Sequence, residues 1–357
     1  MAVNLVAEAH AEVIYEGQDL SAIVTPYLHQ LVYVDHLHGE EPDALEVELE
    51  DRQRLFQGPL APRRGAALSF RFGQRADNRF ESGQGFEIDE IEVNGPPDLV
   101  RLRCLGNVPS SRIHDQVSYA WEGVTLDQIA RSIAAKHGLA VSTDASGIVL
   151  RRMTQHDESD LAFLKRLAKD YGLVCSLKGD KQGTPAVLLL LKAESLEQRP
   201  PVYELGRSSC TRYRFRDKIQ PGSRGSYTRY FDSSLKDLVE FEVKVAPDEV
   251  FDGLLKKTVP GLWGRSQQLR HRLRGGRANV EIHARRALRS SKTYEHEATL
   301  TCDGEPRLRS GVTVTLPADG VDGWGANGGA WIVLHSRHTL NVDQGYTTEI
   351  TIRKVLK

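Results

Sequence analysis

The stretch GFEIDEIEVNGPPDLVRLRCLG, residues 85–106, indicates two β-strands joined by a tight turn. In both runs apolar residues largely alternate with charged ones, which is the pattern of a strand with one buried face. The sequence Asn94-Gly95-Pro96-Pro97 between them is a strong turn signal, because glycine and proline favour backbone angles that end a strand. The stretch is therefore predicted to be an antiparallel hairpin.

The same two-residue period runs through the N-terminal third, from Glu12 to Leu105. Residues 43–52 (DALEVELEDR) alternate leucine and valine with acidic residues, and residues 66–73 (AALSFRFG) repeat the pattern with leucine and phenylalanine. This third is predicted to be an antiparallel β unit. The residues expected on its buried faces are Leu45, Val47, Leu49, Leu68, Phe70 and Phe72.

The middle third changes to a helical period. Residues 125–139 (TLDQIARSIAAKHGL) have apolar residues at helical spacing, with Thr125 and Gln128 in capping-box positions and Gly138 as the stop. Residues 155–173 (QHDESDLAFLKRLAKDYGL) show a similar pattern. Each helix leads into β-prone sequence, so a small α/β unit is predicted, with an arrangement of two helix-strand modules.

The last third returns to strands but is interrupted. A segment at about 232–292 mixes loop and helix, and residues 277–288 (RANVEIHARRAL) are its best helical piece. A second β domain that carries an insertion fits this order better than a third independent domain. Its strands are predicted in residues 210–219, 225–232, 312–317, 329–341 and 346–356.

Composition excludes several classes of protein. The chain has 357 residues, with 47 basic and 48 acidic ones, which argues against a general nucleic-acid binder. The four cysteines lie far apart in the sequence without a CxxC pair, so buried free thiols in a reducing compartment are expected. The N-terminus lacks the pattern of a signal peptide, and no apolar run approaches the roughly 20 residues of a membrane span. The protein is expected to fold in the cytoplasm.

The residues His156 to Asp160 are of the types that build hydrolytic and metal sites. Acids are also favoured in the first turn of a helix, where they meet unpaired N–H groups and the positive end of the dipole. We therefore predict a helix start with Asp157 as N-cap. The buried face of this helix is predicted to contain Leu161, Leu164, Leu167 and Tyr171, and Gly172 is predicted to end it.

Other candidate sites favour structural interpretations. His36 with His38, and His335 with His338, could be metal pairs, but no third ligand is marked by spacing. The glycine-rich residues 322–331 lack the lysine of a phosphate-binding loop and are predicted to be a flexible hairpin tip. No GxSxG or HExxH motif occurs, so neither catalytic residues nor a cofactor nor a metal is predicted.

Residues 265–289 contain eight arginines and only one acidic residue. A solvated helix face, an acidic protein partner and nearby nucleic acid all remain open, and the near-neutral total charge favours the acidic partner. The arginines are Arg265, Arg270, Arg272, Arg274, Arg277, Arg285, Arg286 and Arg289.

Several segments, taken in order, resemble the late control D family of temperate phages. This family comprises tail-hub proteins of contractile tails and is related to the N-terminal hub region of VgrG. The Glu158-Ser159-Asp160 motif and the helix after it are similar to a VgrG segment. The segments are residues 43–52, 61–73, 85–106, 155–173, 304–317 and 335–353.

This resemblance implies an α+β, mainly β fold with two antiparallel β-barrel tube domains flanking a small α/β domain. The first tube domain is expected in residues 1–106, the α/β domain in 107–200, and the second tube domain, with its insertion, in 201–357. In a homotrimer these would form a ring of six around a channel, adapting a sixfold tail tube to a threefold spike. The expected partners are the tail tube, a separate spike protein, the tape-measure protein and other baseplate proteins, with no membrane and no nucleic acid except DNA passing through the channel.

The resemblance places the protein in the virion tail or baseplate, assembled in the host cytoplasm, and leaves open a phage, a bacteriocin or a secreted system. The family carries no catalytic residues in this region, so the matching positions are expected to be architectural. These positions are Asp51, Arg52, Pro62, Gly65, Gly95, Pro96, Gly345 and Thr348.

Two other functions remain open from the residues alone. Residues 125–142 resemble the helix and following turn of a peptidoglycan-binding LysM module. The historical label of the family suggests a DNA-binding regulator of late genes, which would use the arginine-rich segment.

Overall fold

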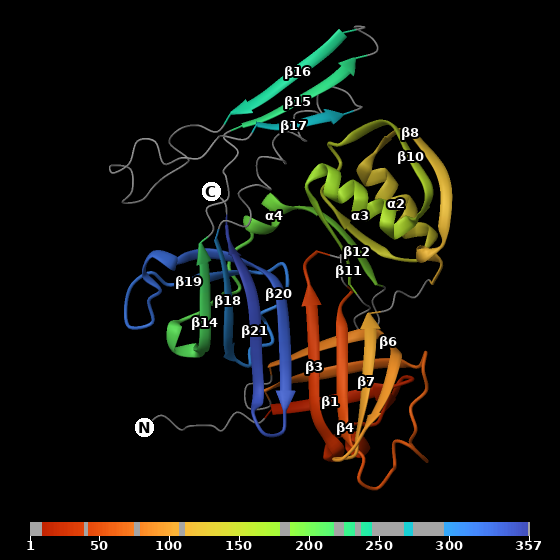
Figure 1. Ribbon diagram of the computed structural model, residues 1–357, viewed down its shortest axis with the longest axis vertical. Helices are drawn as coiled ribbons and strands as arrows, with labels where there is room; N and C mark the ends of the chain where they lie inside the picture. Colours follow the sequence, from red (N-terminus) through yellow and green to blue (C-terminus); the bar gives the residue numbers. More distant parts are fainter. Residues whose placement is uncertain are drawn as a thin grey trace.

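The computed structural model describes residues 9–38, 42–74, 79–106, 111–178, 186–217, 225–232, 237–244, 268–273 and 296–355. These residues form one large sheet, three small sheets and a few helices (Figure 1). The predicted α+β, mainly β class is confirmed. No helix among them has the length and apolar character needed to cross a membrane.

The large sheet contains strands from both ends of the chain. All its strand pairs are antiparallel except β13 with β19. Its main path runs β14 (Cys210–Asp217), β18 (His296–Asp303), β21 (Gly345–Lys354), β20 (Gly329–Asn341), β3 (Leu28–His36), β4 (Ala44–Glu50), β7 (Leu99–Gly106), β6 (Arg79–Asn94), β5 (Ala67–Gln74), β1 (Ala9–Tyr15) and β2 (Gln18–Asp19). Strands β19 (Thr313–Leu316) and β13 (Tyr203–Glu204) branch from β20.

The predicted hairpin is confirmed, because β6 and β7 pair from Asn94 opposite Leu99. The alternation also places the expected residues on the buried face. Leu45 and Val47 are fully buried beside the stacked rings of Phe70 and Phe72, whose centroids lie 5.5 Å apart. The apolar alternation therefore determines which face of each strand is buried.

The described strands of the two predicted barrels belong to two halves of this one sheet, and no closed barrel is found among the described residues. Strand β3 of the N-terminal half pairs directly with β20 of the C-terminal half, with Leu31 opposite Leu340 and Tyr33 opposite His338 (Figure 1). Alternation specifies which face of a strand is buried but not which strand pairs with it. The sequence therefore did not indicate this β3–β20 pairing, which is called the seam below. Two apolar cores pack against the sheet: one contains residues of the N-terminal half together with Leu340 and Tyr346, and the other contains residues of the C-terminal half.

The middle unit contains the two predicted helices, α2 (Leu126–Lys136) and α3 (Asp160–Tyr171). The capping box of Thr125 and Gln128 is present, and Gly138 and Gly172 follow the helices with positive φ angles of 67° and 69°. Each helix leads into a strand of one sheet, as predicted. That sheet has the order β11 (Leu173–Lys178), β12 (Val187–Lys192) and β9 (Ala140–Thr143), and β8 (Gln116–Thr125) pairs with β10 (Val149–Ser159).

The predicted N-cap Asp157 is wrong. Strand β10 continues through Ser159, whose Oγ accepts a hydrogen bond from the Ala162 backbone N–H at 3.2 Å, so Ser159 is the N-cap. Asp157 lies in a β-bulge with a φ of 47°, because the register of β10 on β8 shifts between Gln155 and Glu158. The predicted apolar face is nevertheless buried in the core of the middle unit.

Replacing Ser159 with alanine is expected to lower the free energy of unfolding by about 1 kcal/mol, because the N–H of Ala162 loses its acceptor. Asp157→Asn is the matched control and should change stability by less than about 0.5 kcal/mol, since asparagine tolerates the left-handed backbone equally well. Denaturant unfolding of both variants measures the difference. An equal loss for the two would contradict the assignment of the cap.

The insertion begins earlier than predicted. Strands β14 and β18 pair directly, so the segment between them leaves and re-enters the large sheet at one place. Strand β15 (Gly225–Asp232), predicted as part of the second barrel, instead forms a separate sheet with β16 (Asp237–Lys244) and β17 (Gln268–Leu273). The helix predicted in residues 277–288 lies outside the described residues.

The remaining helical elements are short. They are α1 (Ser21–Val24), η1 (Thr25–Tyr27), η2 (Ser111–His114), α4 (Ala193–Glu197), η3 (Arg207–Ser209) and η6 (Gly325–Asn327).

Candidate functional site

A buried polar cluster joins the three parts of the chain where β3 ends. Lys178, the last residue of β11, donates hydrogen bonds from Nζ to Asp35 of β3 at 2.5 Å and to Asp43 at 3.1 Å. It also donates to the carbonyl oxygen of His36 at 2.8 Å. The C-terminal part contributes Ser310, whose backbone N–H and hydroxyl donate to the two Asp35 oxygens at 2.9 and 2.8 Å. Lys178 of the middle unit thus contacts residues of both the N-terminal and the C-terminal part of the chain.

The electrostatics of this cluster depend on its cations. Burial alone would raise the pKa of Asp35, but the charges of Lys178 and Arg309 and the hydrogen bonds around it hold that pKa well below its usual range. The pKa of Asp43 is raised, first because the group is buried and second because Asp35 lies nearby, although Lys178 opposes this shift. Asp35, which is 1% exposed, is therefore the charged centre of the cluster.

The cluster continues along the seam through aromatic rings. Arg309 donates from Nη2 to the Tyr33 hydroxyl at 2.6 Å, and the Tyr33 ring stacks on His338 with centroids 6.0 Å apart. His338 is fully buried, and its Nδ1 lies 2.9 Å from the Tyr346 hydroxyl and 3.2 Å from Thr348 Oγ1. Burial first, and the Arg309 charge second, lower the pKa of His338 to about 3.

A second buried ion pair fastens the middle unit to the last strand. Arg353 of β21 donates to Glu197 of α4 at 2.5 Å, and both side chains are at most 4% exposed. Thr313 Oγ1 donates to the carbonyl oxygen of Leu196 at 3.3 Å. The middle unit also makes an apolar contact, formed by Leu37, Val174, Leu191, Leu196 and Ile332. The middle unit is thus docked on the large sheet by two buried ion pairs and one apolar cluster.

The acidic residues at the start of α3 have structural partners. Asp160, 3% exposed, accepts hydrogen bonds from Lys136 at 2.7 Å and Gln155 at 2.9 Å, and it lies 2.8 Å from His137 Nε2. Burial opposes ionisation of Asp160, but these hydrogen bonds lower its pKa overall. Glu158 pairs with Arg166 at 2.8 Å. The motif therefore ties the end of α2 to the start of α3.

The face of the large sheet opposite the cores is polar. On its N-terminal half, Arg101 pairs with Glu48 at 2.7 Å and Arg103 pairs with Glu90 at 2.9 Å. At its other end, the exposed arginines of β14 share this face by register and alternation. They are Arg212, Arg214 and Arg216. A sheet that is apolar on one face and charged on the other is suited to border water.

Three predicted architectural positions lie in the loop after β4 and in the loop before β5. Asp51, 1% exposed, accepts hydrogen bonds from the Phe56 backbone N–H at 3.0 Å and from Gln57 Nε2 at 3.1 Å, which shapes the loop after β4. Arg52 is exposed and lies 3.4 Å from Glu50. Gly65 has a φ of 79°, which a larger side chain would strain.

The other predicted positions lie in turns and on the seam. A Cβ on Gly95 would approach Asp98 Oδ1 to 2.6 Å, so a larger residue here would have to displace the Asp98 carboxylate, and Pro96 follows Gly95 through a cis bond. Gly345 has a φ of 74° in the turn between β20 and β21, and Thr348 lies fully buried beside His338. Pro62 is partly buried in the loop before β5.

The arginine-rich segment lies mostly outside the described residues. Arg270 and Arg272 belong to β17, and the other six arginines are not among the described residues.

The histidines that meet in the structure are not the two pairs considered as metal ligands from the sequence. The structure brings together the rings of His36 and His335, 4.6 Å apart across the β3–β20 seam, whereas His335 and His338 lie on opposite faces of β20. Among the described residues no group of three or more histidine, cysteine or acidic side chains has a metal-binding arrangement.

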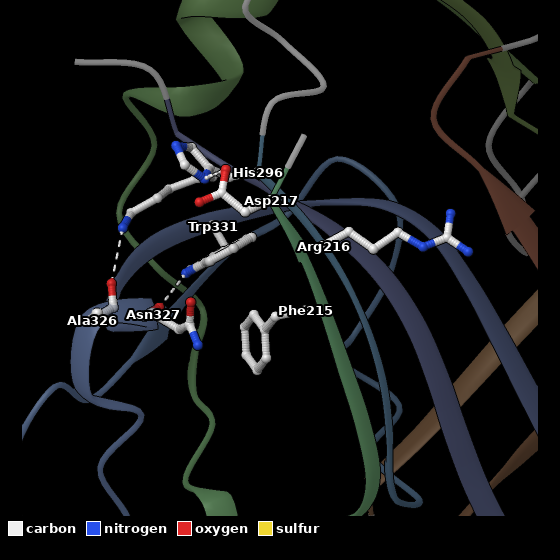
Figure 2. A pocket seen from close by; sticks show the side chains of 8 residues that line it. Phe215, Arg216, Asp217, His296, Ala326, Asn327 and Trp331 are labelled. Carbon is white, nitrogen blue, oxygen red and sulfur yellow. Dashed lines mark hydrogen bonds and ion pairs between the residues drawn. The ribbon is translucent and has the colours of Figure 1, made fainter. Parts of the chain in front are cut away.

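A small pocket of about 190 Å³ lies where β14 ends and β18 begins, next to the insertion (Figure 2). Asp217 and His296 pair across it at 3.2 Å, and Trp331 Nε1 donates to the Asn327 carbonyl oxygen at 3.0 Å. The nearby glycine-rich loop, predicted as a flexible tip, contains a buried Trp324 that donates to the Leu205 carbonyl oxygen at 2.8 Å. The pocket is thus bordered by an exposed ion pair and by the ring of Trp331.

Sequence reasoning missed the buried ion pairs. Asp35 is the exception that could have been found, because it follows Leu31 and Tyr33 on the core-facing positions of its strand. A lone carboxylate on an apolar face signals a buried partner. Its partners Lys178 and Arg309 carry no such signal.

Comparisons with known proteins agree on one family. The sequence model described as phage tail baseplate hub (GPD) matches residues 100–344. A probable baseplate hub protein of Escherichia phage 186 is 30% identical over 218 residues, which cover 59% of this chain and 52% of that protein. Its counterpart in Escherichia phage P2 is 29% identical over 219 residues, covering 60% and 53%. The match therefore spans about half the length of these relatives.

Solved structures share the fold. A tail protein from Neisseria meningitidis MC58 has a TM-score of 0.67 at 13% identity, with 98% of both chains covered. The 43 kDa tail protein of prophage MuSo2 from Shewanella oneidensis has a TM-score of 0.65 at 13% identity, covering 97% of this chain and 98% of that one. A type VI secretion component from E. coli has a TM-score of 0.55 at 12% identity, covering 91% and 73%.

Proposed function

The chain belongs to the phage tail baseplate hub (GPD) family, and from this premise we propose that it is a homotrimeric hub that adapts a sixfold tail tube to a threefold spike. The observation that carries the proposal is the β3–β20 seam, since it sets two antiparallel halves side by side in one chain. Three such chains would supply six halves. A closed ring of this kind is a common symmetric solution for an oligomer.

The free edge of the sheet supports assembly. Within the described residues β14 pairs with β18 alone, so it presents an edge along its other side. Exposed edges are usually covered or paired, because their backbone groups recruit other strands. In the proposed ring, a neighbouring subunit covers β14.

The polar face supports a channel. The ion-paired face of β4, β7 and β6 and the arginines of β14 belong to one continuous sheet surface. In the proposed ring this face borders the channel, which holds the tape-measure protein and later passes DNA.

We propose the following roles for the parts of the chain. Residues 1–106 and 201–357 form the two tube domains, with the insertion between β14 and β18, and residues 107–200 form the α/β domain. The tail tube binds on one side and a spike on the other, with further baseplate proteins outside, in a virion tail that is assembled in the host cytoplasm. The arginine-rich segment 265–289 contacts an acidic protein surface.

Native mass spectrometry of the full chain tests the trimer. The expected species has three times the 39.8 kDa chain mass, and its share should rise with protein concentration. Mixing with the spike protein should stabilise the same species. A chain that stays monomeric at every concentration, and also with spike present, would refute the proposal.

A further inference from the structure

Two cysteines that are 92 positions apart in the sequence meet on neighbouring strands. Cys210 begins β14 and lies directly opposite Cys302 of β18, and their sulfur atoms are 2.8 Å apart. Residues opposite each other in antiparallel strands have Cα atoms about 4.5–5.5 Å apart. This spacing lies within the range of disulfide-bonded cysteines. The backbone is therefore already placed for a disulfide.

The other two cysteines have no such partner. Cys104 is buried in the core of the N-terminal half and Cys175 in the core of the middle unit. All four cysteines are among the described residues, so the pairing of Cys210 with Cys302 is specified by the fold.

The two thiols differ in access. Cys210 is partly exposed on the edge strand, whereas Cys302 is 1% exposed. The contact with Cys210 and burial both raise the pKa of the Cys302 thiol. A reagent from solution therefore reaches Cys210 first, and Cys302 reacts second.

We propose that Cys210 and Cys302 are an oxidation site that forms an intrachain disulfide when the protein meets a small-molecule disulfide such as oxidised glutathione. The Cys210 thiolate attacks one sulfur of the reagent and releases one thiol. The Cys302 sulfur loses its proton to solvent, attacks the Cys210 sulfur of the mixed disulfide and releases the second thiol. Two protein thiols are oxidised while one reagent disulfide is reduced to two thiols.

The bond would join the start of the edge strand β14 to the end of β18, at the opposite end of this strand pair from the insertion. Residues 211–301 would then lie within one covalent loop, so the start of β14 could not separate from β18. Reducing cytoplasm keeps such a pair as thiols, and an oxidising medium favours the bond. In the proposed ring a neighbouring subunit covers β14, so the bond is expected on unassembled chains that meet an oxidising medium; this timing rests on the proposed function, but the bond itself does not.

Thiol counting on the folded full chain tests this proposal. The protein is incubated with oxidised glutathione, denatured in acid and labelled with a maleimide, and the number of labels is read by mass spectrometry. The reduced protein should take up four labels and the oxidised protein two, with digestion yielding one peptide that links Cys210 to Cys302. A mixed disulfide at Cys210 should appear before the final product.

The variant Cys210→Ser is the matched comparison, because position 210 is partly exposed and tolerates serine. It should take up three labels after reduction, and after oxidation it should yield no intrachain link. For the wild type, the oxidised protein should unfold at a higher denaturant concentration than the reduced one, and this shift should be absent in the variant. Four labels on folded, oxidised wild type would overturn the proposal, as would a link through Cys104 or Cys175 or between two chains. The trimer is tested on reduced protein and the disulfide by thiol counting, so failure of one proposal is distinguishable from failure of the other.

Discussion

Replacing Lys178 with alanine is expected to lower the free energy of unfolding by about 3–5 kcal/mol, since it leaves a buried carboxylate without its closest cation. Lys178 donates to both Asp35 and Asp43, whereas Arg309 donates to Asp35 through its Nε at 3.2 Å. The substitution also removes a contact between the middle unit and both halves of the sheet. The loss should therefore be larger than that of an ordinary surface ion pair.

Denaturant unfolding followed by circular dichroism measures this loss. Lys192→Ala is the matched control, because Lys192 is an exposed lysine at the end of a strand in the same small sheet, and its change should stay within about 0.5 kcal/mol. Equal stability of Lys178→Ala and Lys192→Ala would show that the cluster contributes nothing to holding the three parts together.

Acidification is expected to destabilise the protein through His338. Its pKa is about 3 in the folded chain, against about 6.5 for an unfolded histidine, so the unfolded state binds the proton first as the pH falls. The free energy of unfolding should then decrease as the pH is lowered from 6.5 to 3, by up to about 1.4 kcal/mol per pH unit from this group. Above pH 6.5 the ring is neutral in both states and contributes no pH dependence.

Unfolding curves at several pH values check the sign and size of this effect. The variant His338→Gln keeps a polar side chain beside Tyr346 and Thr348 but cannot take up the proton. Its stability should fall less steeply than that of the wild type between pH 6.5 and 4. Parallel pH profiles for the two proteins would rule out His338 as a source of the acid sensitivity.

Local patterns in the sequence predicted most of the elements. The alternation in residues 43–52 and the hairpin signal at Gly95 each describe neighbours in the chain, and both are confirmed. The caps at Thr125 and Gly172 are local as well. The β3–β20 seam could not be predicted, because nothing in either strand specifies a partner so distant in the sequence.

The same reasoning explains the errors at the candidate site. The acids of residues 156–160 favoured a helix start, but the bulge at Asp157 let the strand continue to Ser159, and bulges depend on the partner strand. The buried pair of Glu197 and Arg353 could not be foreseen, since two charges in separate segments are normally assigned to the surface. Asp35 carries a signal of burial in the sequence, as a carboxylate within an apolar face, but no prediction was made for it.

The seam also sets the order in which the chain can fold during synthesis. Strand β3 is complete once residue 36 has left the ribosome, but its partner β20 spans Gly329–Asn341 and arrives only when nearly all of the chain has been made. Contacts between such distant residues form slowly. Until then the nascent N-terminal half carries an unpaired apolar strand edge, which can recruit other nascent chains. Truncated chains that stop before β20 should therefore aggregate during expression while the full-length chain does not.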